Sequence, residues 1–390
     1  MQELIATGCF HSAVPEGRAV LAAVRAAKTS GALVIDAGDF FGGSAFHTFS
    51  QGRVEQRLLT DLYDAVVPGN HDFADLLRLQ DPAAFPPVVC ANVRPHPDFR
   101  GHWVAGLVLA GARRRVGIVG YMGRQAFDAI PAAEREGFEF TTPTADLLAA
   151  QAAPLRAQGA EVVVGVSHSG FLSDVADQEA DWPIHVVVAS HCHSPWSLWS
   201  KGGRHVAKPP ANGAGLLRLL LRPEGPQQAV LESPAPSTAD DGLEQEVTAF
   251  GKWAGERLGS LPRPLPDRRD VAAALGEHAR SAPGVDAFLL NTYALRKGMP
   301  AGVTRGDLFA CAPFDSELVT LDRPHRLDAL IDRASELGED TVACSNAHAV
   351  DETTITTTRY LAERLAVAWR PLDPPCSLHG LLIDLVRESR

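Results

Sequence analysis

Short apolar runs that end in a potential metal ligand recur five times in the first half of the chain. Each run has the length and composition of a buried β-strand. The ligand-type residues that follow the runs are Cys9 and His11, Asp39, Asn70 and His71, His168, and His191 and His193. Parallel strands carry the residues at their carboxyl ends to one edge of a sheet, where open α/β sheets place their ligand sites. The five endings therefore predict an α/β fold with a metal site at the edge of a sheet.

The segments between these runs have the spacing of amphipathic helices. In residues 15–28 and 53–63, apolar positions recur every three or four residues, as on the buried face of a helix. Residues 143–159 predict a third helix, with Thr144 as its N-cap and Gly159 at its end. The alternation of strands and helices favours a single α/β domain in the first half.

Two domains are expected, because 390 residues are too many for one ordinary hydrophobic core. We assign residues 1–225 to the first domain, residues 226–245 to a linker rich in Pro, Ser and acidic residues, and residues 246–390 to a smaller α/β domain. In the second domain, residues 305–322 alternate like a pair of strands. Residues 354–367 begin as a β-branched run and continue with a helical pattern.

Composition and charge argue against several classes of function. The formal net charge is −11 and the basic residues form no extended cluster, so no nucleic-acid partner is expected. No window approaches the roughly 18 uninterrupted apolar residues of a membrane span. The N-terminus lacks the features of a signal peptide, and the six cysteines include no CxxC pair, so free thiols are expected. These features predict a cytoplasmic protein without a membrane partner.

The motifs at the predicted strand ends occur in an order that resembles the metallophosphoesterases. They are C-F-H at 9–11, D-A-G-D at 36–39, G-N-H-D at 69–72, S-H-S at 167–169 and S-H-C-H at 190–193. In the second half, residues 291–296 and 312–321 are similar to two stretches of the 5′-nucleotidase C-terminal domain. The resemblance covers nearly the whole chain. It implies a metallophosphoesterase-type α/β sandwich followed by a smaller, substrate-binding α/β domain.

The resemblance implies two divalent ions and a phosphorylated small-molecule substrate. One ion would be bound by His11, Asp39 and His193, together with Cys9, and the other by Asp39, Asn70, His168 and His191. Two such ions bind the phosphoryl oxygens and lower the pKa of a shared water, so that a bridging hydroxide attacks the phosphorus. His71 would stabilise the leaving oxygen as a general acid does, and Asn70 would help to hold the phosphate.

Cys9 occupies a position where the family has Asp, and two interpretations stay open. As a thiolate, Cys9 would be a soft ligand that favours zinc or iron over magnesium or manganese. Alternatively, it is a buried thiol, and one ion is loosely held or absent. The expected cofactor is two divalent ions of zinc, manganese or iron, with the number open because of this residue.

The support for His71 also departs from the family pattern. The family commonly has Asp three residues after this histidine, where it orients the imidazole. This position is Ala74 here, which leaves Asp72 or Asp75 as candidate supports. Five further histidines match no motif and are expected to have structural or surface roles: His47, His96, His102, His185 and His205.

The second half keeps only part of the family's substrate-binding pattern. Asn291, Arg296 and Phe314 match ligand-contacting positions, although ordinary strand packing is the alternative for Phe314. Bulkier residues replace two glycines in the 291–296 stretch. The family's second aromatic ring lies on a Gly-rich loop that this chain lacks, and Trp369 is a candidate replacement by sequence proximity alone.

The sequence thus predicts a metal-dependent phosphomonoesterase that acts on a nucleoside 5′-monophosphate or a related small phosphorylated metabolite. Two alternatives remain. Because the second half departs from the family pattern, the chain could be a dinuclear hydrolase of a diester, a nucleotide-sugar or a sulfur ester. Because Cys9 and Ala74 replace expected carboxylates, it could instead be a ligand-binding protein that has lost catalysis. The sequence does not predict the oligomeric state.

Overall fold

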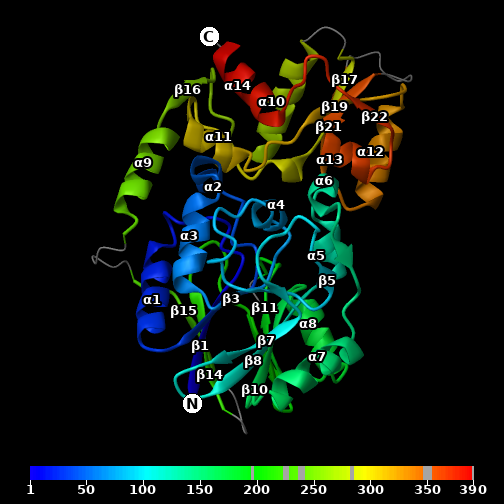
Figure 1. Cartoon of the computed structure of the whole chain (residues 1–390). Coiled ribbons are helices and arrows are strands. Elements are labelled where there is room, and N and C mark those ends of the chain that lie inside the picture. The colour runs from blue at the N-terminus through cyan, green and yellow to red at the C-terminus, as the bar shows by residue number, and fades with distance from the viewer. Residues whose placement is uncertain (195–196, 223–227, 236–241, 282–284, 346–353, 389–390) are drawn as a thin grey trace. The chain divides into compact units, whose positions relative to one another are not determined.

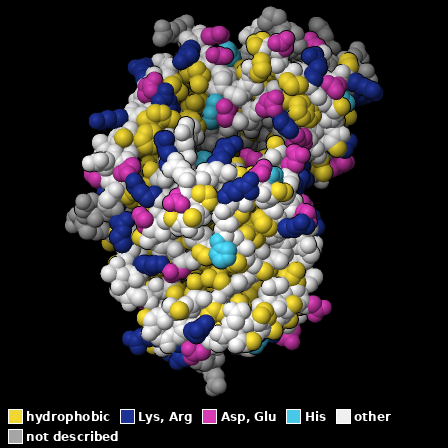
Figure 2. Space-filling view, in the orientation of Figure 1, with side chains coloured by type: hydrophobic (Ala, Val, Ile, Leu, Met, Phe, Trp, Pro, Cys, Tyr) yellow, Lys and Arg dark blue, Asp and Glu magenta, His cyan; other side chains and the backbone are white. Residues whose placement is uncertain are grey.

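Two compact units make up the chain, Met1–Val247 and Thr248–Arg390 (Figure 1). The computed structural model describes residues 1–194, 197–222, 228–235, 242–281, 285–345 and 354–388. Both units combine helices with β-sheets, which confirms the predicted α/β class. On the face shown in Figure 2, acidic and basic side chains are interspersed.

Two sheets form the body of the first unit. The first has the strand order β15-β14-β1-β2-β3-β4-β6 and the second has the order β12-β13-β11-β10-β8-β7. The strands of the first sheet are β1 (Gln2–Thr7), β2 (Leu33–Asp36), β3 (Ala65–Val66), β4 (Val88–Val89), β6 (Trp103–Val104), β14 (Leu216–Leu221) and β15 (Gln228–Glu232). Those of the second are β7 (Gly106–Ala110), β8 (Arg115–Met122), β10 (Val162–His168), β11 (Val186–Ala189), β12 (Leu198–Lys201) and β13 (Arg204–Ala207). A separate pair joins β5 (Val93–Arg94) to β9 (Glu139–Phe140).

Parallel pairing dominates the centre of each sheet. In the first sheet β1, β2 and β3 run parallel, and in the second β8, β10 and β11 run parallel. The carboxyl ends of these strands therefore gather at one edge of each sheet. This is the arrangement that the five apolar runs predict.

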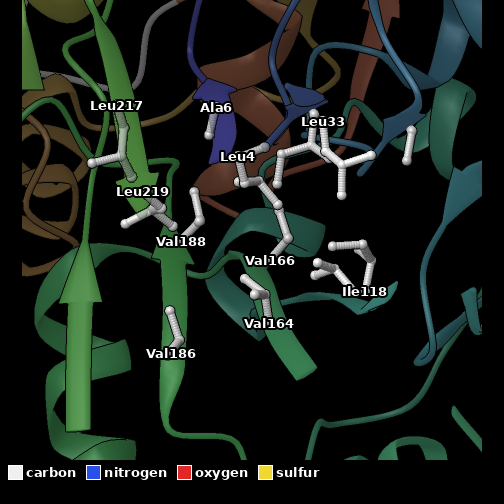
Figure 3. Close-up of a cluster of buried hydrophobic side chains, with 14 of the residues drawn as sticks. Leu4, Ala6, Leu33, Ile118, Val164, Val166, Val186, Val188, Leu217 and Leu219 are labelled. Carbon is white, nitrogen blue, oxygen red and sulfur yellow. The ribbon is translucent and has the colours of Figure 1, made fainter. Parts of the chain in front are cut away.

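A hydrophobic core lies between the two sheets. Its side chains point toward one another from both sheets, and those labelled in Figure 3 include Leu4 and Leu217 of the first sheet and Val166 and Val188 of the second. Helices cover the outer faces, with α1 against β2, α7 against β8 and α8 against β13. Burial on both faces explains why these strands read as continuous apolar runs instead of alternating ones.

The helices of the first unit include the three predicted from the sequence. They are α1 (Arg18–Thr29), α2 (Ala45–Ser50), α3 (Arg53–Leu62), α4 (Phe73–Leu76), α5 (Arg124–Asp128), α6 (Ala132–Arg135), α7 (Ala145–Ala157) and α8 (Phe171–Glu179). Thr144 is the N-cap of α7, and its side chain accepts a hydrogen bond from the Leu147 amide at 3.2 Å. Gly159 follows the end of this helix with a φ of +90°, a conformation that glycine adopts without strain.

Part of the segment expected to be a linker belongs to the first sheet. Strand β15 pairs antiparallel with β14, and Arg218 holds the Glu232 carboxylate through two hydrogen bonds of 2.6 and 3.0 Å. An edge strand needs backbone partners more than apolar side chains, so its composition resembles that of a linker. Residues 226–227 and 236–241 of the expected linker lie outside the described residues.

The second unit is built on one mixed sheet with the strand order β20-β17-β21-β19-β22. These strands are β17 (Ala287–Asn291), β19 (Leu318–Leu321), β20 (Thr341–Ser345), β21 (Ile355–Thr358) and β22 (Trp369–Pro371); β16 (Arg257–Ser260) and β18 (Gly302–Thr304) form a small second pair. The helices are α9 (Glu244–Ala254), which begins in the first unit, α10 (Arg268–Arg280), the 3-10 turn η1 (Thr292–Ala294), α11 (Arg305–Cys311), α12 (Leu327–Glu336), α13 (Arg359–Arg364) and α14 (Leu378–Glu388).

The prediction of a strand pair over residues 305–322 is wrong in its first half, which forms the helix α11. Thr304 and Asp307 make a capping box: the Thr304 hydroxyl accepts from the Asp307 amide at 3.2 Å, and the Asp307 carboxylate accepts from the Thr304 amide at 3.0 Å. These two bonds satisfy amides of the first helical turn and start a helix where the apolar alternation favours a strand. Residues 354–367 follow the prediction, with β21 leading into α13.

Candidate functional site

The predicted ligands of the first unit lie where its parallel strands end. His168 is the last residue of β10, and Cys9, Asp39, Asn70 and His191 follow β1, β2, β3 and β11 within four residues. Backbone hydrogen bonds fix each strand in the sheet, so the end of each strand is rigid. The conformations of the loops that follow the strands then determine which side chains come into contact.

Six of the seven predicted ligands, together with His71, come together in three overlapping groups. The groups are Cys9, His11 and His193; His11, Asp39 and His71; and Asp39, His168 and His191. Within each group the potential ligand atoms all lie within 4.8 Å of one another. Asn70, the seventh, adjoins them through its Oδ1, which lies 3.0 Å from His191 Nδ1. Because His11 and Asp39 each belong to two groups, the three groups form one continuous cluster.

Short contacts between nitrogen and oxygen atoms hold this cluster together. His11 Nε2 lies 3.0 Å from His193 Nε2 and 3.8 Å from Asp39 Oδ2. His168 Nε2 lies 3.1 Å from the same carboxylate oxygen. Two imidazole nitrogens face each other at 3.0 Å only with a proton or a cation between them, because their lone pairs otherwise repel.

The orientation of His168 is set by its second ring nitrogen. His168 Nδ1 lies 2.8 Å from the carbonyl oxygen of Ala37. A carbonyl only accepts, so Nδ1 is the nitrogen that carries the proton and Nε2 faces Asp39. A backbone carbonyl in this position is the usual outer partner of a metal-binding histidine.

Burial keeps two other histidines of the cluster neutral. It lowers the pKa of His11 to about 3 and the pKa of His191 to about 4. Burial alone would also lower the pKa of His168, but the Asp39 carboxylate raises it to about 9. Burial likewise opposes ionisation of Asp39, yet His168 holds the pKa of this carboxyl well below its usual range. At neutral pH, without metal, the cluster thus holds neutral His11 and His191, the Asp39 carboxylate and a His168 ring that loses a proton when it binds a cation. Imidazoles and a carboxylate together are a donor set that suits divalent cations.

Cys9 is buried beside the first group, and its sulfur has two partners. The His191 amide donates to Cys9 Sγ at 3.2 Å, and the Ser190 hydroxyl lies 3.2 Å from the same atom. Burial and the Asp39 carboxylate raise the pKa of the Cys9 thiol far above its usual value. A cation at this position would be needed to remove the proton, as in thiolate metal sites.

The loops that carry the ligands adopt unusual backbone conformations. Cys9, His11, Asp39 and His191 have φ values of 49°, 53°, 59° and 79°, a region that non-glycine residues rarely occupy. Backbone bonds pin this geometry: the Cys9 amide donates to the Gly38 carbonyl at 2.7 Å and the His11 amide to the Asp39 carbonyl at 2.8 Å. Such conformations concentrate at functional sites, where the surrounding structure overcomes the strain.

Two glycines allow the loops to approach one another closely. A Cβ atom at Gly38 would lie 2.5 Å from His168 Nδ1, and one at Gly69 would lie 2.2 Å from Asp39 Oδ1. Both distances are shorter than any real Cβ contact. The glycines of D-A-G-D and G-N-H-D are therefore required by the packing of the ligand residues themselves.

Asp72 and Asp75, the two candidate supports for His71, have other partners. Asp72 Oδ2 accepts from the amides of Asp39 at 2.8 Å and Gly69 at 2.7 Å, and its Oδ1 accepts from the amide of Phe41 at 3.0 Å. Asp75 Oδ2 lies 2.9 Å from His47 Nε2. Asp72 therefore stabilises the loops that carry the ligands, and Asp75 contacts His47.

His71 is placed in the cluster by its backbone and its ring. Its amide donates to Asp39 Oδ1 at 2.9 Å, and its imidazole lies edge-on to that of His11, with ring centroids 5.2 Å apart. Unlike His168, His71 is only partly buried. It therefore sits beside the ligands and also faces solvent.

The predicted substrate residues of the second unit lie near one end of its sheet. Asn291 ends β17, is buried, and donates from Nδ2 to Glu339 Oε2 at 3.4 Å. Arg296 as a whole is exposed. Partial burial of its guanidinium, together with the positive charge of Arg268, lowers the pKa of this group. Phe314 is exposed as well. Sequence reasoning did not identify Glu339, because only the folded sheet brings it next to Asn291.

The sequence matches the family model of the calcineurin-like phosphoesterases over residues 4–208, which is more than half of the chain. It is 29% identical over 244 residues to a snake venom 5′-nucleotidase from Gloydius brevicauda, a match that covers 59% of this chain and 37% of the relative. A snake venom 5′-nucleotidase from Naja atra is 27% identical, with 63% of this chain and 43% of the relative covered. The matches thus span less than half the length of these relatives.

Solved structures share the fold over nearly the whole chain. A 5′-nucleotidase precursor from Thermus thermophilus has a TM-score of 0.75 at 18% identity, with 99% of this chain and 96% of that chain covered. A 5′-nucleotidase from Candida albicans has a TM-score of 0.74 at 12% identity, with 100% and 98% covered. The sulfate thiohydrolase SoxB from Thermus thermophilus has a TM-score of 0.71 at 17% identity, with 96% and 80% covered. At such identities the likeness shows the fold alone.

Within the described part of the chain, every helix is too short or too polar to cross a bilayer.

Proposed function

Because the chain belongs to the calcineurin-like phosphoesterase family, we propose that it is a metal-dependent phosphomonoesterase. Its proposed substrate is a nucleoside 5′-monophosphate or a related small phosphorylated metabolite. One observation carries the proposal: Asp39 and His11 join three groups of potential ligands into one cluster at the ends of parallel strands. The 5′-nucleotidases among the similar proteins support the choice of substrate class.

The proposed cofactor is a pair of divalent ions of zinc, manganese or iron. One would be held by Cys9, His11, Asp39 and His193, and the other by Asp39, Asn70, His168 and His191. When bound, such ions neutralise the phosphoryl oxygens and lower the pKa of the water that attacks the phosphorus. Asp39 is suited to a shared position because its Oδ2 faces His11 and His168 at 3.8 and 3.1 Å.

The protein's own groups would orient the phosphate and assist departure of the leaving oxygen. Asn70 adjoins the cluster, and its amide nitrogen is a donor that suits a phosphoryl oxygen. His71 is partly exposed beside the buried ligands. We assign its imidazole to the leaving side, where a protonated ring donates to the departing oxygen.

We assign Asn291, Arg296 and Phe314 of the second unit to the part of the substrate that lies beyond the phosphate. Asn291 offers a buried amide, Arg296 a cation and Phe314 an exposed ring. These three groups recognise by hydrogen bonding, charge and stacking, and we assign none of them to the water that attacks or to the oxygen that leaves. Substitutions here are therefore expected to change KM more than kcat.

The proposal is tested by phosphate release from a defined substrate panel. The purified chain is stripped of metal, reloaded separately with zinc, manganese or iron, and offered nucleoside monophosphates, sugar phosphates, diesters and nucleotide-sugars. Turnover of monophosphates is expected with at least one metal. His102→Ala, which changes an exposed histidine outside the three groups, serves as the control and should keep full turnover. If no ester in the panel is hydrolysed with any metal, the proposal fails. Preferential cleavage of a diester or a nucleotide-sugar would favour the alternative hydrolase.

Substitution of Cys9 tests whether this residue is a metal ligand or a plain buried thiol. Under the proposed function, Cys9→Asp keeps both ions but shifts the preferred metal from zinc toward manganese, because an oxygen ligand replaces a sulfur. Cobalt-loaded protein should show a sulfur-to-cobalt charge-transfer band that Cys9→Asp and Cys9→Ser both lose. If metal preference, spectrum and turnover are the same in all three proteins, Cys9 is a plain buried thiol.

A further inference from the structure

The carboxyl end of strand β13 lies at the same edge of the second sheet as the ligand cluster. Strand β13 is the parallel neighbour of β11, with Val188 opposite Ala207, and the ligands His191 and His193 follow β11. Lys208 is the first residue after β13. Because parallel strands bring their carboxyl ends to one edge of a sheet, Lys208 starts beside the end of the strand that carries these two histidines.

The alternation of side chains along β13 puts Lys208 on the face of the sheet that helix α8 covers. Val206 belongs to a buried cluster that includes Phe171, the first residue of α8, whereas Ala207 belongs to the core between the two sheets. The Lys208 amide donates to the Ser197 carbonyl at 2.8 Å, which continues the pairing of β13 with β12. Successive side chains of a strand point to opposite faces, so Lys208 lies on the side of Val206, toward the start of α8.

Lys208 is a buried cation without a partner. The residue is only 4% exposed, and within the part of the chain that the structure describes its ammonium makes no hydrogen bond and no ion pair. Other lysines of the unit are paired: Lys28 Nζ lies 2.5 Å from Asp64 Oδ1, and Lys201 Nζ lies 3.1 Å from Glu179 Oε1. Removal of an ammonium from water is unfavourable unless an anion lies beside it. The position of Lys208 therefore favours an anion that comes from outside the chain.

Helix α8 begins on the same face, and its first turn offers amides to an anion. The N-cap is Gly170, which has no side chain to accept from these amides. The Phe171 amide donates to Cys192 Sγ at 3.2 Å, and a thiol sulfur is a weak acceptor. The next two amides, those of Leu172 and Ser173, have no protein acceptor among the described residues. Such amides, together with the helix dipole, attract anions to the start of a helix.

Two titratable groups at the start of α8 report on the surroundings of Lys208. Burial opposes ionisation of the Cys192 thiol, but hydrogen bonds and the positive charge of Lys208 lower its pKa, so the ammonium lies within electrostatic range of this sulfur. Asp174 is the acidic residue in the first turn of α8. Burial raises the pKa of Asp174 well above its usual value, and the Tyr121 hydroxyl donates to its Oδ1 at 3.3 Å. Asp174 is therefore neutral and does not balance the charge of Lys208.

We propose that Lys208 and the first turn of α8 form a binding site for a phosphate-type oxyanion, next to the metal cluster and separate from it. Lys208 supplies the charge, and the amides of Leu172 and Ser173 supply hydrogen bonds. Phosphate is favoured over a carboxylate because its four oxygens can meet a cation and several amides together. The anion is either free inorganic phosphate or a second phosphoryl group of the substrate, which present the same oxygens. This inference goes beyond the proposed function and does not require turnover.

Calorimetric titration of the full chain with inorganic phosphate, in the presence of chelator, tests the site without bound metal. Lys208→Met is expected to weaken phosphate binding about tenfold or more, the effect of losing a hydrogen bond to a charged group. Lys208→Arg keeps the charge and should lose less. Lys201→Met, which removes an exposed lysine of β12, is the matched control and should bind phosphate as the wild type does.

Thermal unfolding separates this role from a structural one. Without phosphate, Lys208→Met should melt at the same temperature as the wild type or higher, because the substitution removes a buried charge that has no partner. Added phosphate should raise the melting temperature of the wild type, because a ligand that binds only the folded chain stabilises it. The melting temperature of Lys208→Met should not respond. A lysine with a purely structural role would not make stability depend on phosphate.

The metal-loaded protein distinguishes the two sources of the anion. If the source is free phosphate, Lys208→Met raises the inhibition constant of inorganic phosphate. If the source is a second phosphoryl group, Lys208→Met raises KM for a sugar bisphosphate and leaves KM for the matching monophosphate unchanged. The inference is overturned if the wild type binds no phosphate in chelator, or if Lys208→Met binds it as tightly as the wild type does. Neither result bears on the proposed function, which fails only if the metal-loaded protein hydrolyses no ester of the panel.

Discussion

The two units use the same device, the ends of parallel strands, to build two different surfaces. In the first unit the gathered groups are buried: Asp39 and His168 are almost inaccessible, and the loops that hold them are in strained conformations. In the second unit, aromatic rings that lie near strand ends are exposed, as Tyr360 and Phe314 show. Charged ligands must be desolvated and fixed to bind cations, whereas a recognition surface must leave its faces open to the ligand.

This difference predicts separable effects of substitution. Changes at the cluster of the first unit should alter metal content, turnover and folding stability. Changes at Asn291, Arg296 or Phe314 of the second unit should alter affinity for the substrate and leave metal content unchanged. Four predictions test this separation between the two units, in order of decreasing expected effect.

Asp39→Ala should have the largest effect. Asp39 belongs to two of the three groups, so its loss removes a ligand from both proposed ions, and we expect kcat to fall by about three orders of magnitude. Elemental analysis should show reduced metal content. Asp64→Asn is the control: Asp64 binds Lys28 and the Val34 amide in the same unit, and its change should leave metal content unaltered. Equal turnover in Asp39→Ala and the wild type would remove the basis for the comparison.

Asp72→Ala tests whether buried polar contacts hold the ligand loops. The substitution leaves the amides of Asp39, Phe41 and Gly69 without their acceptor. Each buried donor without a partner costs about 1 kcal/mol or more, so the free energy of unfolding should fall by about 3 kcal/mol. Urea denaturation of the metal-free chain measures this. Asp64→Ala, which frees one amide, should lose less; a loss below about 1 kcal/mol for Asp72→Ala would contradict the assignment.

The metal-free chain should lose stability as the pH rises from about 6.5 to 9. Burial opposes protonation of His168, but Asp39 raises its folded pKa to about 9, above its ordinary value of 6.5. Its contribution is therefore complete below pH 6.5 and is lost as the pH rises through 9; the expected size is on the order of 3 kcal/mol. Asp39, whose folded pKa is lowered, contributes only above its ordinary value of 3.8.

Thermal unfolding in chelator at pH 6 and pH 9.5 checks this prediction. His168→Asn, which cannot titrate, should show a smaller change between the two values. Metal affinity should move the opposite way over the same range, because a proton must leave His168 before a cation binds. A melting temperature that stays constant or rises toward pH 9.5 would mean that the Asp39–His168 pair is not formed.

Phe314→Ala should give the smallest of the four effects. The ring is 36% exposed, so its loss costs little stability, but one stacking surface for the substrate disappears. We expect KM for adenosine monophosphate to rise about fivefold, with kcat and metal content unchanged. Leu198→Ala, which changes an exposed apolar residue of the first unit, is the control. A fall in kcat without a change in KM would place Phe314 with the chemistry of the first unit.

The cluster of the first unit could be predicted from the sequence because its information is local. Each ligand follows its own apolar run, and the rule for parallel strands then brings the ends together. The helix ended by Gly159 and capped by Thr144 was predictable for the same reason. The ligand roles, the number of ions and the cytoplasmic location stay predictions.

The features that the sequence did not reveal depend on contacts between distant segments. Glu339 and Tyr360 meet only because β20 and β21 flank β17 in the folded sheet. The role of Asp72 depends on three amides from two loops, and no spacing in the sequence indicates it. Strand β15 was not predicted, because a strand at the edge of a sheet needs few apolar residues. Helix α11 was not predicted, because the apolar alternation of its sequence favoured a strand more strongly than its capping box favoured a helix.

Anomalous diffraction from a zinc-loaded crystal would locate the bound ions. Two zinc peaks are expected about 3.5–4 Å apart, with Asp39 between them, one beside Cys9, His11 and His193 and the other beside His168 and His191. A difference map with no peak within bonding distance of Asp39 would contradict the proposed metal site.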